Sequence, residues 1–170
     1  MDVQIRLFKP EDLEHILKIQ ADSLRRLSPS YSLTQIEALV NSQRSVRLYM
    51  NEIIVVAEYK HEIIGFASML YRQSRISGIY VHPNFARQGI GTQILIALEK
   101  LAIQNKFKII DVVSSLSAVK FYQENGYQII GESGFYCQNN VWIDCVDLEK
   151  QLSPLTEIEK WCLWLKRLFF

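Results

Sequence analysis

Alternation of apolar and polar side chains predicts the first strands of the chain. In residues 3–8, Val3, Ile5 and Leu7 fall on one face, which is typical of a half-buried strand. Residues 53–59 are instead rich in β-branched side chains throughout. Such a run predicts a strand that is buried on both faces.

A turn signal then predicts two more central strands. Lys60-His61 has the length of a two-residue hairpin turn, although it lacks the usual glycine, so Glu62–Leu70 is expected to return antiparallel. The next apolar run, Arg75–Val81, predicts a strand that ends at a polar loop. After that loop, apolar side chains recur at helical spacing, which predicts a helix over residues 92–105.

Two helices are expected between the first strand and the second. Proline and acidic residues open the segment 10–27, whose apolar positions have helical spacing. Ser32 and Gln35 have capping-box spacing and predict a short second helix. Residues 41–51 are polar and are expected to form a loop or a ragged helix end.

Shorter elements end the domain. Residues 109–113 predict a strand, and Ser117 is expected to cap a short helix that ends at Gly126. A final pair of strands is expected over residues 127–130 and 141–148, joined by a loop of Gly, Ser and Asn residues.

The predicted order is β-α-α-β-β-β-α-β-α-β-β. It favours a mixed α/β sheet with helices on both faces. Residues 1–150 are expected to form this one domain, and residues 151–170 an added amphipathic helix.

The added helix is expected to start at Ser153-Pro154. At helical spacing, one wide apolar face contains Leu155, Ile158, Trp161, Cys162, Trp164, Leu165, Leu168 and Phe169. The opposite face contains Glu159, Lys160, Lys166 and Arg167. Such a helix packs on its own domain or on a second subunit, as a homodimer; binding to a membrane surface is the less favoured alternative.

Composition narrows the function classes. A net charge of +1 over 170 residues gives no argument for a nucleic-acid partner. The odd number of cysteines, without C-x-x-C spacing, fits buried thiols in a reducing compartment and predicts no metal site. The start of the chain has no secretory pattern, and no apolar run approaches the ~20 residues of a membrane span. We therefore expect a cytoplasmic protein without stable membrane insertion.

The loop after Arg75–Val81 has the features of an anion site. Gly89 and Gly91 precede a helix, whose first turn offers unpaired N–H groups and a partial positive charge. Between Glu62 and Glu99 the chain has no acidic residue, while three arginines lie in this interval. The pattern predicts a site for phosphate or pyrophosphate; an ordinary strand-to-helix turn is the alternative.

Two segments together resemble the GNAT superfamily of acyl-CoA-dependent N-acetyltransferases. The first runs from Tyr80-Val81-His82-Pro83 to the loop sequence RQGIG at residues 87–91. The second, residues 115–127, reads SLSAVKFYQENGY and is similar to the family's A-x-x-F-Y-x-x-x-G-F/Y segment. The resemblance implies a mostly antiparallel sheet in which a central parallel pair of strands, here 76–81 and 109–114, splays apart around pantetheine.

The resemblance also implies roles for individual residues. Tyr122 matches the tyrosine that faces the thioester sulfur and acts as general acid for the departing thiolate. Acetyl-CoA is the implied cosubstrate, and a primary amine attacks it directly in a ternary complex without a metal. Residues implied in cofactor binding are Ile79, Val81, Arg87, Gln88, Gly89, Ile90, Gly91, Thr92, Ser115 and Ala118.

The chain also departs from the family pattern. Ala86 stands where the loop usually has Gln or Arg, and the positive charge lies one residue later. Ser115 stands where many members have an asparagine. The strand before the loop has no carboxylate, so candidates for the general base are Glu58, His82, Asp111 or a chain of water.

These departures leave a second function class open. A non-catalytic module with the same fold, which binds CoA as a sensor or as a partner subunit, also fits the residues. The acceptor stays undetermined between small metabolites, aminoglycosides, peptide N-termini and protein lysines, because its specificity lies in loops.

Overall fold

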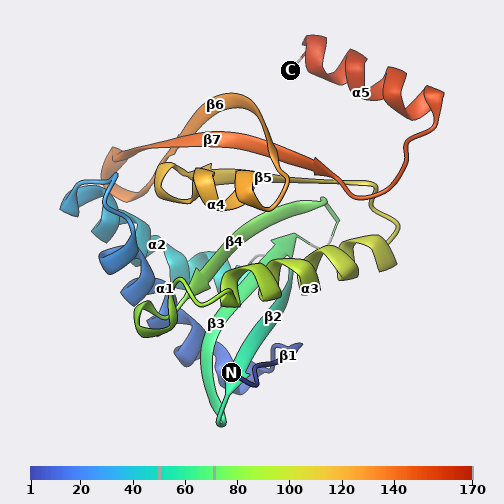
Figure 1. The fold of residues 1–170 in the computed structure, drawn as a ribbon. Coiled ribbons are helices and arrows are strands. Elements are labelled where there is room, and N and C mark those ends of the chain that lie inside the picture. The colour runs from blue at the N-terminus through green and yellow to red at the C-terminus, as the bar shows by residue number, and fades with distance from the viewer. Residues whose placement is uncertain (50, 71, 170) are drawn as a thin grey trace.

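One mixed β-sheet organises the protein (Figure 1). The computed structural model describes the backbone of residues 1–49, 51–70 and 72–169, and their side chains except those of 43–46, 48, 49 and 166–169. Across the sheet, the strands are β1 (Gln4–Leu7), β2 (Glu52–Tyr59), β3 (Glu62–Leu70), β4 (Arg75–Val81), β5 (Ile109–Ser115), β7 (Trp142–Gln151) and β6 (Gln128–Tyr136). Only β4 and β5 pair in parallel; the other described pairs are antiparallel.

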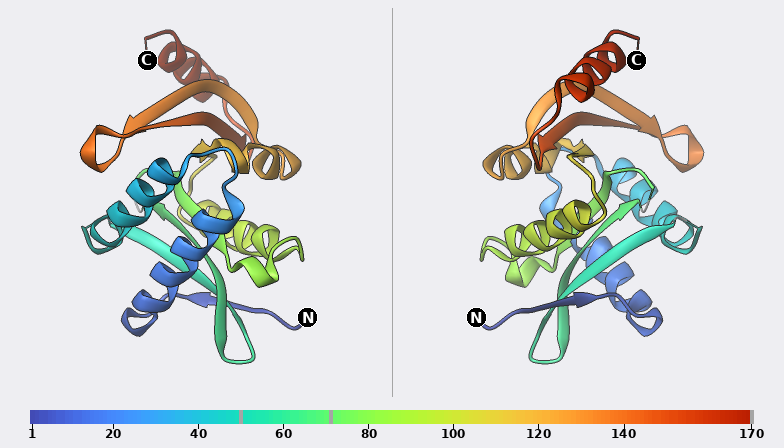
Figure 2. Two further views of the ribbon diagram at one scale, coloured as in Figure 1. Left: turned by 90° about the vertical axis from the view of Figure 1, so that its left-hand side faces the viewer. Right: turned by 90° about the vertical axis from the view of Figure 1, so that its right-hand side faces the viewer.

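Helices cover both faces of this sheet, as the sequence predicts. The helices are α1 (Leu13–Leu27), α2 (Leu33–Tyr49), α3 (Ile90–Gln104), α4 (Val119–Glu124) and α5 (Glu157–Phe169). Helices α1 and α2 lie on one face and α3 on the other (Figure 2). The mixed α/β architecture with an added C-terminal helix is therefore confirmed.

Each face of the sheet has its own apolar core. On the α3 side, Ile94 and Leu98 are fully buried against the sheet. On the α1 side, Ile16 and Phe66 belong to a separate buried cluster. Full burial of one such side chain is worth about 1.5–3 kcal/mol, so both helix layers hold the central strands firmly.

The parallel pairing of β4 with β5 is very short. The register contains only Arg75 opposite Asp111 and Ile76 opposite Val112. At the same point β4 has a bulge, because Met69 of β3 pairs with Ile76 while the preceding residue pairs with Gly78. A bulge bends its strand and increases the local twist, and β4 and β5 diverge beyond it (Figure 1). The expected splayed pair is confirmed.

The hairpin turn at Lys60-His61 is also confirmed. Both residues have positive φ, 50° and 66°, as a type I′ turn requires. The predicted capping box is present too, since the Gln35 N–H donates to Ser32 Oγ and the Ser32 N–H donates to Gln35 Oε1.

Three predicted boundaries were wrong. Helix α2 continues to Tyr49, where a loop or a ragged helix end was expected over residues 41–51, because its polar residue Arg47 is buried against the sheet. Helix α3 begins two residues early, at Ile90, because Gly89 adopts φ 80° and serves as its N-cap. Strand β6 continues to Tyr136 through the expected glycine loop, because β7 pairs with it along that length.

The expected cap at Ser117 was wrong as well. Strand β5 extends to Ser115, a short 3₁₀ turn follows at Leu116–Ala118, and α4 starts only after Ala118. The Ser117 hydroxyl instead accepts a bond from the Ser30 N–H at 3.4 Å. Gly126, with φ 87°, ends α4 as predicted.

Helix α5 starts at Glu157 rather than at the predicted Ser153-Pro154. A capping box fixes this start: the Thr156 N–H donates to the Glu159 carboxylate at 2.8 Å, and the Glu159 N–H donates to Thr156 Oγ1. Before it, the Ser153 N–H bonds the carbonyl of Lys108, which keeps the chain along the sheet.

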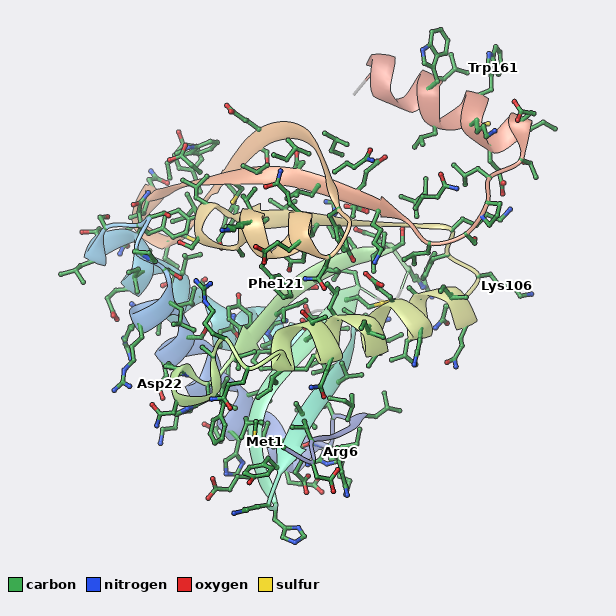
Figure 3. All side chains as sticks on the ribbon, in the orientation of Figure 1. Met1, Arg6, Asp22, Lys106, Phe121 and Trp161 are labelled. Carbon is green, nitrogen blue, oxygen red and sulfur yellow. The ribbon has the colours of Figure 1, made fainter. Side chains whose placement is uncertain are left out.

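The apolar face of α5 is largely exposed in the single chain. Ile158, Trp161 and Trp164 are 76%, 64% and 55% exposed, and Trp161 points away from the domain (Figure 3). Four residues expected on this helix, Lys166, Arg167, Leu168 and Phe169, have side chains outside the described part of the structure. Among the described residues, no helix is long and apolar enough to cross a membrane.

Candidate functional site

The divergence of β4 from β5 leaves one edge of β4 unpaired. The N–H of His82, just after β4, donates to the Ile64 carbonyl of β3 at 2.8 Å. Successive residues of a strand direct their N–H and C=O groups to opposite edges. The backbone groups of Ile79 and Val81 therefore point away from β3, toward the space that β5 has left. An extended ligand with amide groups can pair with this edge as a strand would.

The N-terminal end of α3 follows this edge after the loop of residues 82–89. The first bond of α3 is that of the Gln93 N–H to the Gly89 carbonyl, so the N–H groups of Ile90, Gly91 and Thr92 precede the helical ladder. The Ile90 side chain itself is buried in the core, so this residue offers only its backbone. These three amides and the helix dipole favour an anion.

The loop before α3 is exposed at the residues with cofactor roles implied by the resemblance. Arg87, Gln88 and Gly89 are all exposed, and Arg87 has φ 63°. The Gln88 amide donates to the Asn84 carbonyl at 3.2 Å, which holds the loop in a compact form. Arg87 and Gly89 thus both adopt left-handed backbone conformations in this short loop.

Phe121, in the second motif (residues 115–127), contacts Gly91 at the end of the first motif (residues 80–91). A Cβ at Gly91 would lie 3.2 Å from the Phe121 ring and 3.8 Å from a Val81 methyl group. Phe121 lies between α4 and α3 in Figure 3. Glycine at position 91 therefore permits the close packing that brings α4 to the splayed strands.

Tyr122 is buried beside this contact. Its side chain is 3% exposed and packs edge-on against Phe121 and Tyr127. Burial raises the pKa of the Tyr122 phenol well above its usual range, with a smaller contribution from the charge of Tyr80. Within the described part of the chain, no hydrogen bond of the Tyr122 phenol is present. This phenol therefore stays protonated and has a free donor.

Ser115 and Ala118 lie on the β5 side of the divergence. Both belong to the end of β5 or the turn after it, and both are half-buried. They lie across the divergence from Ile79 and Val81, which belong to β4. The structure thus brings the two implied groups of cofactor residues to the two sides of one strand divergence.

Tyr31 is a residue that the sequence reasoning missed. Its phenol donates to the Asp144 carbonyl at 2.5 Å and accepts the Leu116 N–H at 3.1 Å. Burial raises the pKa of Tyr31 to about 12. These bonds tie the α1–α2 connection to β7 and to the turn after β5. The only sequence signal was one aromatic residue within a polar break.

The two carboxylate candidates for a general base are held in ion pairs. Glu58 accepts from Arg6 Nε at 2.8 Å, and Asp111 accepts from Arg75 Nε at 2.6 Å where β4 and β5 are still paired. His82 lies in the loop, where its Nδ1 accepts the Asn84 N–H at 3.3 Å. Among the described residues, no group of three or more His, Cys, Asp or Glu side chains is arranged to hold a metal ion.

Comparison with known proteins identifies this arrangement. The family model of the acetyltransferase (GNAT) domain matches residues 27–152. A GCN5-related N-acetyltransferase from Rhodopseudomonas palustris superimposes with a TM-score of 0.82 at 27% identity, covering 89% of this chain and 96% of that one. No curated protein sequence matches the chain.

Two more distant structures share the fold, and each was solved with a coenzyme A ligand of its own. The PaiA N-acetyltransferase from Thermoplasma acidophilum, in complex with coenzyme A, has a TM-score of 0.68 at 18% identity and covers 89% of this chain and 99% of its own. YncA from Salmonella typhimurium, with acetyl-CoA, has a TM-score of 0.64 at 15% identity and covers 92% and 97%.

We predict that the Tyr122 phenol does not ionise between about pH 9 and pH 11, because its folded-state pKa lies above the ordinary value of about 10. Tyr122→Phe should therefore leave the tyrosinate difference absorbance of the folded protein unchanged in that range. Because the folded-state pKa is raised, the neutral phenol stabilises the fold below pH 10, and this contribution is lost as the pH rises.

If Tyr122→Phe lost an absorbance change equal to that of one tyrosine, with circular dichroism still native, the buried assignment would be contradicted.

Proposed function

Because this chain belongs to the GNAT family of acetyltransferases, we propose that it moves an acetyl group from acetyl-CoA to a primary amine in one ternary complex. The observation that carries the proposal is the divergence of β4 from β5 after Ile76. That divergence lies between the amide-lined start of α3 and the buried phenol of Tyr122. One elongated ligand can place an anionic end at the start of α3 and an acyl end beside the Tyr122 phenol.

In this proposal the pantetheine arm lies along the free edge of β4. The backbone groups of Ile79 and Val81 bond its amides, and Ser115 and Ala118 contact it from the β5 side. The pyrophosphate lies against the first turn of α3, with the exposed loop residues Arg87, Gln88 and Gly89 and the amides of Ile90, Gly91 and Thr92 around it. Relatives solved with coenzyme A or acetyl-CoA support this cofactor.

Ala86 bears on the strength of the pyrophosphate site. This residue contributes no side-chain donor, so the loop's charge comes from Arg87. Because Arg87 is exposed and has positive φ, its guanidinium is free to swing over a phosphate, while the amides are fixed by the backbone. We therefore assign the geometry of binding to the amides and the added attraction to Arg87.

The reaction follows from the positions of these groups. The neutral amine attacks the thioester carbonyl carbon, a C–N bond forms, and the C–S bond breaks to release the CoA thiolate. The amine proton leaves to solvent or a base. In the proposed pose the Val81 N–H donates to the carbonyl oxygen as negative charge develops, and one such donor is typically worth about 10²–10³ in rate.

Tyr122 is the group assigned to the leaving sulfur. Its raised pKa keeps the phenol protonated, so it is always ready to donate. The same raised pKa opposes full ionisation of the phenol, because a free thiol has a pKa of only about 8.5. We therefore refine the general-acid role to a strong hydrogen bond to the sulfur, with the proton reaching the thiolate as solvent enters.

Proton removal from the amine is assigned to water or to His82. The carboxylates of Glu58 and Asp111 are neutralised by Arg6 and Arg75, so neither is available as a base in the arrangement described. His82 lies at the mouth of the strand divergence, just after β4. A primary amine with a pKa near 10 loses its proton more readily as the pH rises, so turnover should increase toward alkaline pH.

We expect Tyr122→Phe to lower acetyl transfer at least tenfold while CoA affinity stays near wild type, because only the donor to the sulfur is lost. Thiol release from acetyl-CoA with a panel of amines measures the first quantity, and calorimetric titration with CoA measures the second.

Tyr127→Phe is the matched control. It removes a neighbouring buried phenol that donates to Glu99 at 3.1 Å. Full turnover by Tyr122→Phe would refute the assignment. CoA binding by wild type without transfer to any amine, protein lysine or N-terminus would favour the non-catalytic CoA-binding module.

We expect Gly89→Ala to weaken CoA binding about tenfold without unfolding the protein. Nothing lies within 4 Å of the added methyl, so the substitution causes no clash. At φ +80°, however, alanine is disfavoured by about 1–2 kcal/mol relative to glycine, and its relaxation should move the amides of the α3 N-terminus. Gly131→Ala, equally uncrowded but without positive φ, is the control and should bind CoA normally.

The exposed face of α5 suggests a homodimer. Ile158, Trp161 and Trp164 together offer on the order of 400 Å² of apolar surface, about half of what one partner contributes to a standard interface. On the edge strand β6, Ile129 and Ile130 are about half exposed, at 50% and 49%. We propose that a second copy covers both surfaces. The helix has nearly balanced charge, with two acidic and three basic residues, which argues against an anionic membrane.

We predict that the full chain has the mass of a dimer in solution and that Ile158→Glu/Trp161→Glu makes it monomeric. Light scattering after size exclusion measures both. Leu33→Glu, which changes an apolar side chain that is 81% exposed on α2, should leave the dimer intact. A monomeric wild-type protein, fully soluble with and without residues 153–170, would end the dimer proposal.

A further inference from the structure

A charged pair is buried between α2 and the sheet. Arg47 of α2 and Glu52 of β2 form an ion pair at 2.6 Å, and each side chain is only 1% exposed. The same guanidinium nitrogen bonds Ser68 Oγ of β3 at 2.6 Å, and Nε donates to Gln20 of α1 at 3.3 Å. One side chain thus connects two helices and two strands.

Stability alone does not explain this pair. Removing two charges from water costs several kcal/mol per ion, and apolar residues of similar volume often stabilise a protein more. The pair is also incompletely satisfied, because the second oxygen of Glu52, Oε1, is buried and has no hydrogen-bond partner in the described part of the structure. A defined geometry is therefore the better account of its presence.

The network reaches β4 through Tyr80. Burial raises the pKa of the Tyr80 phenol, and the nearby charge of Arg47 and a bond with Gln20 partly oppose this shift, which places the phenol at the centre of the network. The Tyr80 ring stacks on Phe66 with 5.3 Å between centroids, and the Arg47 guanidinium lies 5.3 Å from the Phe66 centroid.

The Tyr80 ring in turn covers the bulge of β4. A Cβ at Gly78 would lie 2.5 Å from Cε2 of Tyr80 and 3.1 Å from its hydroxyl oxygen. Gly78 follows the extra residue, Ser77, at which β4 leaves the register with β5. The ring therefore presses on the backbone where the strand divergence begins, one residue before Ile79.

We propose that Arg47 and Glu52 are positioning residues for the acyl end of the cofactor, acting through Tyr80 on the bulge of β4. The inference rests on the proposed acetyl-CoA site and adds residues that do not touch it. With Tyr80 held, the backbone groups of Ile79 and Val81 keep the direction needed for pantetheine and the thioester. The start of α3 lies at the other end of β4, so the nucleotide half of the cofactor is independent of the network.

The double variant Arg47→Met/Glu52→Leu tests this inference, because it removes both charges, fills a similar volume and leaves no unpaired ion. Calorimetric titration compares two probes: acetyl-CoA, and 3′-phospho-ADP, the nucleotide half without pantetheine. We expect a loss of about tenfold or more for acetyl-CoA, the effect of one or two misdirected hydrogen bonds, and no change for 3′-phospho-ADP.

Arg25→Met/Glu37→Leu is the matched control. That pair also joins α1 to α2, with two 2.8 Å bonds, but it is exposed and does not reach β4. It should bind both probes as wild type does. Gly78→Ala, which displaces the Tyr80 ring directly, should reproduce the selective loss of acetyl-CoA affinity if the double variant fails to fold.

Three results decide the matter. Selective loss of acetyl-CoA binding in the double variant supports the inference, as it does in Gly78→Ala where the double variant does not fold. Wild-type affinity for acetyl-CoA in the variant so tested overturns it, and so does an equal loss for both probes, which indicates general destabilisation. If wild type itself does not bind acetyl-CoA, the proposed function fails, a result that is separate from all of these.

Discussion

The structure depends on a backbone pairing that stops. Parallel strands β4 and β5 share a ladder at only Arg75–Asp111 and Ile76–Val112. Beyond that point, the sheet continues on both sides but not across its middle. A buried strand edge without partners is costly, because each unpaired amide group loses its bonds to water on burial. The divergence is thus stable only where solvent or a ligand supplies those bonds, and this makes it the natural place for a ligand that resembles a strand.

The surrounding elements hold this break open from both faces. On one face, α3 and α4 meet at Gly91 and Phe121, so the N-terminal end of α3 and the buried phenol of Tyr122 lie beside one close contact. On the other face, the network around Arg47 and the bonds of Tyr31 fix α1 and α2 against the strands. The apolar cores behind these contacts provide the stability, and the polar contacts choose the geometry.

Much of this could be predicted from periodicity and turn chemistry. The hairpin at Lys60-His61 and the strands before and after it follow from local pattern, and so does the order of the elements. The end of α2 could not be predicted, because Arg47 looks like a surface residue until Glu52 and Ser68 are placed beside it. Long-range pairs of this kind leave no local periodicity.

For the candidate site, too, local motifs could be predicted from the sequence and long-range partners could not. The loop–helix segment was identified from its glycines, and the structure adds which amides precede the helical ladder. The ion pairs that occupy Glu58 and Asp111 were not visible, because their partners Arg6 and Arg75 are distant along the chain. The bulge at Ser77 was equally hidden, since a bulge is a property of two strands in register rather than of one sequence.

The free edge of β4 and the start of α3 have a consequence for regulation under the proposed function. Apart from the Val81 N–H, both contact parts that acetyl-CoA shares with its product CoA, namely the amides of the pantetheine arm and the pyrophosphate. Few of these contacts distinguish acetyl-CoA from free CoA, so free CoA competes for the same edge with similar affinity. The rate in a cell would then follow the ratio of acetyl-CoA to CoA rather than the amount of acetyl-CoA, and the protein would respond to the acetylation state of the carrier pool.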